Sequence, residues 1–332
     1  MTRATLSTPS PTALIVAEVA PSAALAHVEE LVASAAGYAA DAKASATRRA
    51  YAADFRAFEA WCEGHGASSL PATPSTVAVY LAALADAGKR PSTIERALAG
   101  IAHAHRTAGH PWEKGNTAIR SVVTGIRRRL GVAQVQKAPT LADELAAMVG
   151  KLGTDLGGLR DRALLTLGFL GAFRRSELVA LDVADLEATR EGLIVHVRRS
   201  KTDQAGEGMI KAIPYASDAN LCAVRAVRDW LAAAGIASGA IFRAVTKGGA
   251  VGERLEGRAV ARIVQRSAEA AGLDGSRYSG HSLRAGFVTV ATKRGKDVAS
   301  IMRQTGHVNP ATVAKYVRLA NAFEQSAAVG LV

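Results

Sequence analysis

The stretch SGHSLR, Ser279–Arg284, places a histidine and an arginine three residues apart and begins with serine, a residue type that caps helices. A serine in this position favours a helix start, and residues i and i+3 of a helix lie on the same face. An imidazole and a guanidinium on one face are suited to hold a single oxyanion. We therefore predict a helix that starts near Ser279–Gly280 and presents His281 and Arg284 to an anionic group.

The stretch GHVNPATVAKY, Gly306–Tyr316, predicts a further helix that carries a tyrosine. Asn309 has the side chain of a helix cap, and Pro310 suits the first helical position because an N–H there would have no partner. The helix presents Tyr316 about two turns after its start. His307 stands nine residues before this tyrosine.

Upstream, the stretch GAFRRSEL, Gly171–Leu178, ends a long apolar run with two arginines. A guanidinium at the end of a buried helix is unfavourable unless it has a partner or binds an anion. Glu177 lies three residues after Arg174 and can orient it. Arg174 is therefore a candidate for holding an anionic ligand, although a lone arginine of this kind is more often part of a structural ion pair.

Alternating residues predict a β-hairpin in the same region. Leu193, Val195 and Val197 lie on one side of an alternating run, a glycine-containing turn follows, and Met209–Pro214 is the return strand. Lys201 stands at the tip of this hairpin, where it can project a mobile cation.

Length and composition exclude several classes of protein. A chain of 332 residues corresponds to about two domains. Its hydrophobic share of 49% excludes global disorder. The longest nearly apolar run, Ala163–Phe173, is about half of the roughly 20 residues that a bilayer requires. The two cysteines, Cys62 and Cys222, fit buried thiols in a reducing compartment, and the N-terminal stretch lacks the pattern of a secretory signal. These features predict a soluble cytoplasmic protein.

The charge predicts a polyanionic partner. The chain carries 41 Lys and Arg against 29 Asp and Glu, for a net charge of +12. Residues 1–137 hold 15 basic and 10 acidic groups, and residues 138–332 hold 26 and 19, so both halves are basic. Two basic lobes are typical of a protein that binds nucleic acid from two sides, although a soluble basic protein without this function can have the same balance of basic and acidic residues.

The hydrophobic pattern divides the chain into segments. Residues 1–22 are predicted to be a flexible arm, 23–131 a bundle of short helices, 132–139 a linker and 140–332 a second, mostly helical domain. In the bundle, Tyr51, Phe55, Phe58 and Cys62 form one apolar stripe.

Two capping boxes are predicted in this pattern. Pro91-Ser92 with Glu95 would open one helix of the bundle, and Thr140 with Asp143 would open the second domain.

No motif for a cofactor is present in the sequence. It contains no G-x-x-x-x-G-K-[ST] loop, no H-E-x-x-H, no cysteine pair at zinc spacing, and neither G-x-S-x-G nor G-x-G-x-x-G. We therefore expect phosphate chemistry that needs no cofactor, neither ATP nor a metal ion.

The four stretches are weak signals singly, but in this order they resemble the tyrosine recombinase (phage integrase) family, and closely its Cre-type members. The resemblance covers nearly the whole chain after about residue 25. It includes Ala60–Cys62, Leu70–Ala72, Tyr80–Leu81, His105–Arg106, Gly125–Arg128 and Ser279–Ser282. The family implies a mainly α fold: an N-terminal helical core-binding (SAM-like) bundle, a linker, and a mostly helical catalytic domain with a small antiparallel β-sheet and a C-terminal tail helix.

The resemblance also assigns residues. It implies seven catalytic positions, which are Arg174, Glu177, Lys201, His281, Arg284, His307 and Tyr316. Arg175 is excluded because the family motif places the glutamate three positions after the arginine. His307 agrees with most members and departs from Cre, which has tryptophan there. The resemblance further suggests four residues that face DNA, although a solvated surface is a competing interpretation. They are Arg49, Arg96, Arg258 and Arg262.

The implied activity is site-specific DNA recombination or integration. Tyr316 would attack a backbone phosphate and form a 3′-phosphotyrosine, so that strands rejoin without ATP or metal. The implied partner is double-stranded DNA with an inverted-repeat site, bound by a homotetramer assembled from soluble monomers in the cytoplasm, on the bacterial nucleoid. Two alternatives remain: a topoisomerase IB-like enzyme, distinguished by relaxation without a specific site, and a non-catalytic DNA-binding regulator, which would be expected to have a broken catalytic set.

Overall fold

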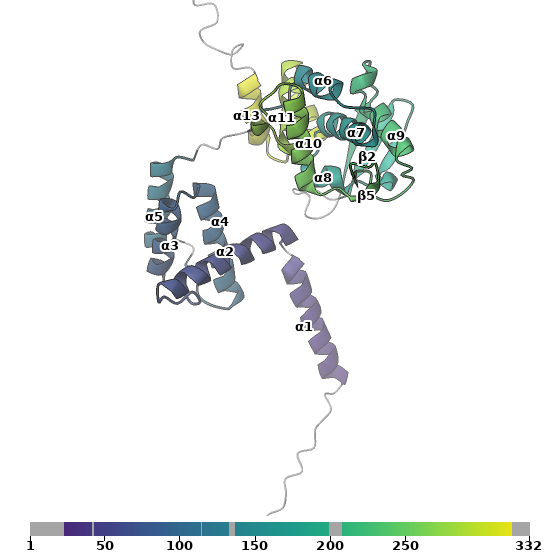
Figure 1. Cartoon of the computed structure of the whole chain (residues 1–332). Helices are drawn as coiled ribbons and strands as arrows, with labels where there is room; N and C mark the ends of the chain where they lie inside the picture. The colour runs from purple at the N-terminus through teal and green to yellow at the C-terminus, as the bar shows by residue number, and fades with distance from the viewer. Residues whose placement is uncertain (1–22, 42, 114, 133–136, 199–207, 321–332) are drawn as a thin grey trace, which may run out of the picture. The chain divides into compact units, whose positions relative to one another are not determined.

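The structure, a computed structural model, describes residues 23–41, 43–113, 115–132, 137–198 and 208–320. The chain divides into two compact units, Met1–Gln134 and Val135–Val332 (Figure 1). Each unit has its own hydrophobic core and is described separately. Within the described part of the chain, no helix is both long and apolar enough to cross a membrane.

The described part of the first unit is helical. Its helices are α1 (Ala23–Asp41), α2 (Ser45–Gly64), α3 (Pro74–Asp86), α4 (Pro91–Thr107) and α5 (Thr117–Leu130). Helix α2 packs against α4, and α3 packs against α5. The predicted stripe on α2 is confirmed in its C-terminal half, because Phe58 and Cys62 are buried. The Phe58 ring lies 5.0 Å from the ring of Tyr80, which joins α2 to α3.

Both predicted capping boxes are wrong. Helix α4 has Arg90 as its N-cap and no side-chain cap bond, since Pro91 takes the first helical position and Glu95 pairs with an arginine of α5 instead. Helix α6 has Leu141 as its N-cap, and the Leu141 N–H donates to Glu144 Oε2 (2.8 Å). The local pattern identified each helix but misplaced its first residue.

The second unit has helices and two small sheets. Its helices are α6 (Ala142–Gly150), α7 (Leu156–Leu170), α8 (Arg175–Ala180), α9 (Ala223–Ala233), α10 (Gly257–Ala270), α11 (Gly280–Lys293), α12 (Val298–Thr305) and α13 (Pro310–Ala320), with 3₁₀ turns at Val183–Asp185, Ala219–Leu221 and Gly275–Arg277. Helix α7 is apolar around most of its circumference, which is typical of a helix surrounded by protein. It contacts α6, α9, α10 and α11 and forms the centre of the unit (Figure 1).

The predicted hairpin is confirmed. Strands β1 (Leu186–Ala188), β2 (Gly192–Val197) and β3 (Met209–Pro214) form an antiparallel sheet in that order. Gly192 pairs with Pro214 and Val197 with Met209. The inward residues of β2 are buried as predicted. Strand β1 and the second sheet, β4 (Arg243–Val245) with β5 (Val251–Arg254), were not predicted, because runs of three or four residues are too short to show a period.

The segment that enters the second unit lies directly on α11. The Thr140 N–H donates to Ser282 O (2.9 Å), and the Ala138 N–H donates to Arg277 O (2.8 Å). Gly286 allows this approach, because a Cβ there would lie only 1.8 Å from the Thr140 carbonyl oxygen. The start of α11 is therefore held by backbone contacts.

Candidate active site

Arg174 lies at a sharp corner between α7 and α8. Ala172 has φ +47°, a left-handed conformation that non-glycine residues rarely adopt, and it turns the chain before Arg174. The Arg174 N–H donates to Glu177 Oε2 (3.0 Å), and its Nη1 donates to Glu177 Oε1 (2.5 Å). Its Nη2 donates to the Gly306 carbonyl (3.2 Å). Buried Glu177 thus orients the guanidinium, as the spacing predicted.

His281 and Arg284 lie in the first turns of α11. Ser279 is the N-cap, and its Oγ accepts from the His281 N–H (3.3 Å), so the predicted helix start is confirmed. Arg284 is buried, and its Nη1 donates to the Ala172 carbonyl (2.7 Å). Its Nη2 is also buried and has no hydrogen-bond partner among the described residues. Such a donor indicates a ligand, because an unsatisfied buried charge is unfavourable.

Tyr316 reaches this group from α13. The helix begins at Pro310, and Asn309 Oδ1 accepts from the Ala311 N–H (2.9 Å), as predicted. The half-buried ring of Tyr316 packs on a small core that includes Val313. Its hydroxyl lies 3.0 Å from Nε2 of His281. A candidate nucleophile and a candidate base are therefore in hydrogen-bonding contact.

His307 follows the C-terminal turn of α12. Gly306 adopts the left-handed conformation (φ +65°) that favours glycine and ends the helix. The chain then places His307 Nδ1 2.8 Å from the hydroxyl of buried Thr305. The Gly306 carbonyl in the same turn accepts a hydrogen bond from Arg174, so this turn positions both His307 and Arg174.

Positive charge dominates the site. Burial, followed by the charge of Arg174, lowers the pKa of Arg284 to about 10. Burial, with the charges of Arg284 and Arg174, lowers the pKa of His307 to about 4. The same three causes, with a contribution from Arg175, lower the pKa of His281 below its ordinary value of 6.5. Both imidazoles are therefore neutral at pH 7, and an entering anion would relieve the repulsion.

Burial and nearby positive charge also affect the pKa of Tyr316. Burial raises the pKa of Tyr316, while the positive charge of Arg284 opposes the increase. The hydroxyl is therefore protonated at pH 7 and needs a base to become a nucleophile.

Lys211 belongs to the site, and our sequence analysis did not identify it. This fully buried lysine on β3 donates from Nζ to the carbonyls of Gly171 (2.8 Å) and Gln304 (2.5 Å), and it lies 4.8 Å from the Phe173 ring centre. It joins β3 to the segments that lead into Arg174 and His307. The signal was present in the sequence, because Lys211 shares the inward face of β3 with buried Ile213.

Burial lowers the pKa of Lys211 to about 7; nearby Glu177 opposes this decrease, and Arg284 and Arg174 add to it. Between pH 7 and the ordinary lysine value of 10.5, the unfolded chain therefore binds more protons than the folded chain. We predict that the free energy of unfolding of this unit rises from pH 7 to pH 9 by up to about 1.4 kcal/mol per pH unit. Lys211→Met should remove this contribution.

The measurement is guanidinium unfolding followed by Trp230 fluorescence, in a background with Trp61→Phe and Trp112→Phe, which leaves one tryptophan, in the second unit. Lys151→Met, which removes an exposed lysine of the same unit, is the control and should keep the slope. If the free energy of unfolding depended on pH in Lys211→Met as it does in the parent, the contribution assigned to Lys211 would be contradicted.

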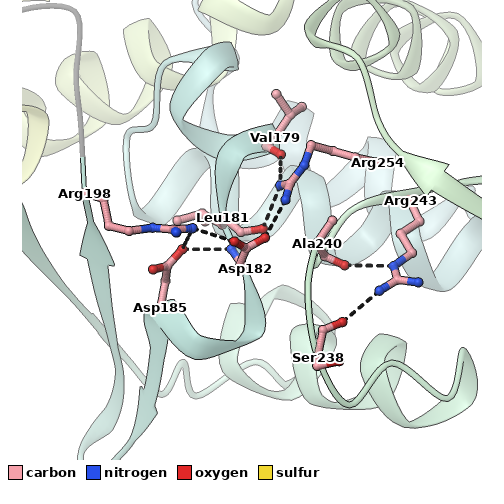
Figure 2. A network of polar contacts seen from close by, with 9 residues as sticks. All are labelled: Val179, Leu181, Asp182, Asp185, Arg198, Ser238, Ala240, Arg243 and Arg254. Carbon is pink, nitrogen blue, oxygen red and sulfur yellow. Dashed lines mark hydrogen bonds and ion pairs between the residues drawn. The ribbon is translucent and has the colours of Figure 1, made fainter.

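Lys201, the predicted hairpin lysine, lies outside the described residues, but the end of the strand leading to it is described. Arg198, directly after β2, donates from Nη2 to Asp182 Oδ2 (2.6 Å) and Asp185 Oδ2 (2.8 Å). Arg254 donates to the other oxygen of Asp182 (2.5 Å), so two guanidinium groups share one carboxylate (Figure 2). These hydrogen bonds, chiefly that from Arg254, lower the pKa of Asp182. The network holds the base of the hairpin against the loop after α8.

The four residues suggested to face DNA have different surroundings. Arg49 on α2 is exposed, and so are Arg258 and Arg262, which lie one turn apart on α10. Arg96 instead makes a two-bonded ion pair with Asp54 (2.8 and 3.0 Å), which links α4 to α2. A contact between Arg96 and DNA would compete with this pair, and all four assignments stay predictions.

Across the described ranges, no three His, Cys, Asp or Glu side chains lie close enough together to hold a metal ion.

Comparison with known protein families identifies the class. The family described as "Phage integrase family" matches residues 140–322, and "Phage integrase, N-terminal SAM-like domain" matches residues 39–109. The chain belongs to the phage integrase family, whose members are tyrosine recombinases. The predicted fold class, with a SAM-like helical first domain and a mostly helical second domain with small antiparallel sheets, is confirmed.

Individual relatives agree with this class. The chain is 41% identical over 292 residues to an integrase/recombinase xerD homolog of Selenomonas ruminantium, covering 86% of this chain and 85% of the relative. It is 27% identical to the tyrosine recombinase XerC of Corynebacterium glutamicum, covering 84% and 83%. The resemblance to Cre-type members stays a prediction.

Solved structures show the same fold. A lambda integrase dimer bound to a COC′ core site has a TM-score of 0.57 and 19% identity, covering 88% of this chain and 93% of that one. The Tn1549 transposon integrase in complex with transposon right-end DNA has a TM-score of 0.58 and 14% identity, covering 82% and 89%.

Proposed function

We propose that this tyrosine recombinase cleaves and rejoins DNA at a specific site through a 3′-phosphotyrosine on Tyr316, without ATP or metal. The observation that carries the proposal is the 3.0 Å contact between the Tyr316 hydroxyl and His281 Nε2, beside Arg284 with its unpartnered buried Nη2. A nucleophile, a base and an unsatisfied cation in one place fit attack on a phosphodiester.

The arginines would bind the phosphate. Each guanidinium offers several N–H donors. Arg174 is held by protein acceptors through Nη1 and Nη2, and Arg284 through Nη1 alone. Their remaining donors can bind the non-bridging oxygens, where negative charge increases in the transition state. Because these donors are fixed before the reaction, little reorganisation is needed when the charge develops.

Proton transfers would involve the histidines and the hairpin lysine. Neutral His281 can accept the Tyr316 proton through Nε2 as the oxygen attacks phosphorus. Lys201 would protonate the leaving 5′-oxygen, and His307 would bind a phosphate oxygen. The bond energy is retained in the ester between Tyr316 and the 3′-phosphate. Attack by another 5′-hydroxyl then restores the DNA and releases the tyrosine.

The proposed partner is double-stranded DNA with an inverted-repeat site, bound by four copies of the chain that are monomers in solution. Supporting observations are the net charge of +12 and the solved recombinases described as bound to DNA. The expected place of action is the cytoplasm, on the nucleoid. The resemblance implies a C-terminal tail helix, and the residues of this tail after Ala320 lie outside the described residues.

The test uses an inverted repeat found in the DNA flanking the gene. Two plasmid copies of it are incubated with the protein in excess EDTA and without nucleotide. We expect recombinant products and a protein–DNA adduct. Products only with added metal or ATP would contradict the proposed chemistry, and relaxation of plasmids that lack the repeat would favour the topoisomerase alternative.

A further inference from the structure

Thr305 has no role in the proposed chemistry, yet its hydroxyl is fully buried beside a site residue. Its Oγ1 lies 2.7 Å from the carbonyl oxygen of Ile301 and 2.8 Å from Nδ1 of His307. A third contact, to the Met302 carbonyl, is longer at 3.4 Å. Three groups thus surround a hydroxyl that has one proton to donate.

The number of available protons determines which group donates in each hydrogen bond. The Ile301 carbonyl can only accept, so the Thr305 hydroxyl proton must point to it. The Thr305 oxygen then accepts, and the donor is an N–H on Nδ1 of His307. With the proton on Nε2 instead, the carbonyl and Nδ1 would both be acceptors for one hydroxyl proton. One of the two short contacts would then join two lone pairs in a buried place, which is unfavourable.

We propose that Thr305 is a positioning residue that holds His307 in the Nδ1–H tautomer and so keeps Nε2 available for the DNA phosphate. This inference rests on the proposed function, because the phosphate is its ligand. Among the described residues, Nε2 of His307 has no hydrogen-bond partner, whereas Nδ1 contacts the Thr305 hydroxyl.

The tautomer defines what His307 does when DNA binds. A neutral ring with its proton on Nδ1 presents a lone pair from Nε2 and cannot donate to a phosphate oxygen. Charged or titratable groups from each side act on the ring: Arg174 from the corner before α8, His281 and Arg284 from α11, and Lys211 from β3. They disfavour the imidazolium until an anion enters. Phosphate entry would then draw one proton from solvent onto Nε2, leaving Nδ1–H on Thr305 and Nε2–H on the phosphate.

The support of Thr305 is rigid. The Gly306 N–H donates to the Met302 carbonyl (2.7 Å), which closes the last turn of α12. Lys211 Nζ donates to the Gln304 carbonyl, and the Gln304 side chain donates to the Leu170 carbonyl (2.9 Å). The hydroxyl is therefore fixed relative to β3 and α7, and a fixed acceptor can select one tautomer.

The first test reads the tautomer without any activity. Protein labelled with ¹⁵N in histidine is studied by long-range ¹H–¹⁵N correlation at pH 7, with His307 assigned by its loss in His307→Gln. We expect a neutral ring protonated on Nδ1 in the wild type and in Thr305→Ser, which keeps the hydroxyl. Thr305→Val, which has nearly the same shape, should lose this preference. An Nε2–H ring in the wild type would overturn the proposal.

The second test asks whether Thr305 acts through His307. Single-turnover cleavage of a full site is measured for wild type, Thr305→Val, Thr305→Ser, His307→Gln and the double variant with valine. We expect Thr305→Val to lower the rate about tenfold, the effect of about one hydrogen bond, and Thr305→Ser to retain most of it. In the His307→Gln background the valine should have little effect. An equal loss in both backgrounds would show a general packing effect and overturn the proposal.

Different results would contradict the proposed function and the role of Thr305. Absence of any covalent adduct in the wild type would contradict the proposed function. A normal adduct with full cleavage by Thr305→Val would leave that function intact and overturn only the role of Thr305. Thermal unfolding of each variant shows that the proteins compared are folded.

Discussion

Replacing Tyr316 by phenylalanine is expected to abolish covalent attachment to DNA while DNA binding stays intact. The substitution removes one oxygen atom, the one that lies 3.0 Å from His281 Nε2. The ring that packs on the core around Val288, Ile301 and Val313 is retained, so α13 should keep its place. No other atom of the side chain can attack phosphorus.

The measurement uses a site with a nick beside the cleavage position, so that the leaving fragment diffuses away and the adduct accumulates. Adduct is read on denaturing gels, and affinity by fluorescence anisotropy of the same DNA. Tyr215→Phe, at a more exposed tyrosine of the second unit, is the matched control and should form adduct normally. Adduct formation by Tyr316→Phe would show that the nucleophile is another group.

Arg174→Ala is expected to slow cleavage by about two to three orders of magnitude, the usual effect of losing one donor to a developing oxyanion. Arg175→Ala should have a much smaller effect. Arg174 is held by Glu177 and by the Gly306 carbonyl, whereas the aliphatic part of Arg175 packs close to Gly280. The two neighbours thus separate an anion-binding role from a packing role.

Stability must be measured with these variants, because Arg174→Ala leaves the buried Glu177 carboxylate without its partner. Arg174→Lys keeps the charge and loses only the planar, bidentate arrangement of donors. Its cleavage should still be clearly slower than that of the wild type. Cleavage is followed in single turnover well below the melting temperature of each variant. Equal rate losses in Arg174→Ala and Arg175→Ala would contradict the assignment.

Short-range patterns predicted the parts of the site that depend on local geometry. Ser279 caps the helix of His281 and Arg284, and Asn309 caps the helix of Tyr316, because capping depends on residues within one turn. The predicted pairing of Arg174 with Glu177 has the same origin. Their meeting at one place followed only from the family resemblance, since no local rule brings α8, α11 and α13 together.

The residues that the sequence analysis missed act over long distances in the chain. Lys211 contacts carbonyls 40 and 93 residues away, at Gly171 and Gln304, and its inward position on a short strand was the one local sign. Thr305 lies two residues from His307, but its importance depends on a hydrogen ordering that a sequence does not show. Helix starts near Pro91 and Thr140 were misplaced because the observed N-caps, Arg90 and Leu141, do not have the side chains that favour this position.

The proposed 3′-phosphotyrosine can be identified directly from the covalent bond between protein and DNA. The adduct formed on a nicked site is digested with protease and nuclease, and the peptide that carries a nucleotide is sequenced by tandem mass spectrometry. We predict a single modified peptide, with the nucleotide joined through its 3′-phosphate to the oxygen of Tyr316. A nucleotide on any other residue, or one joined through a 5′-phosphate, would contradict the account.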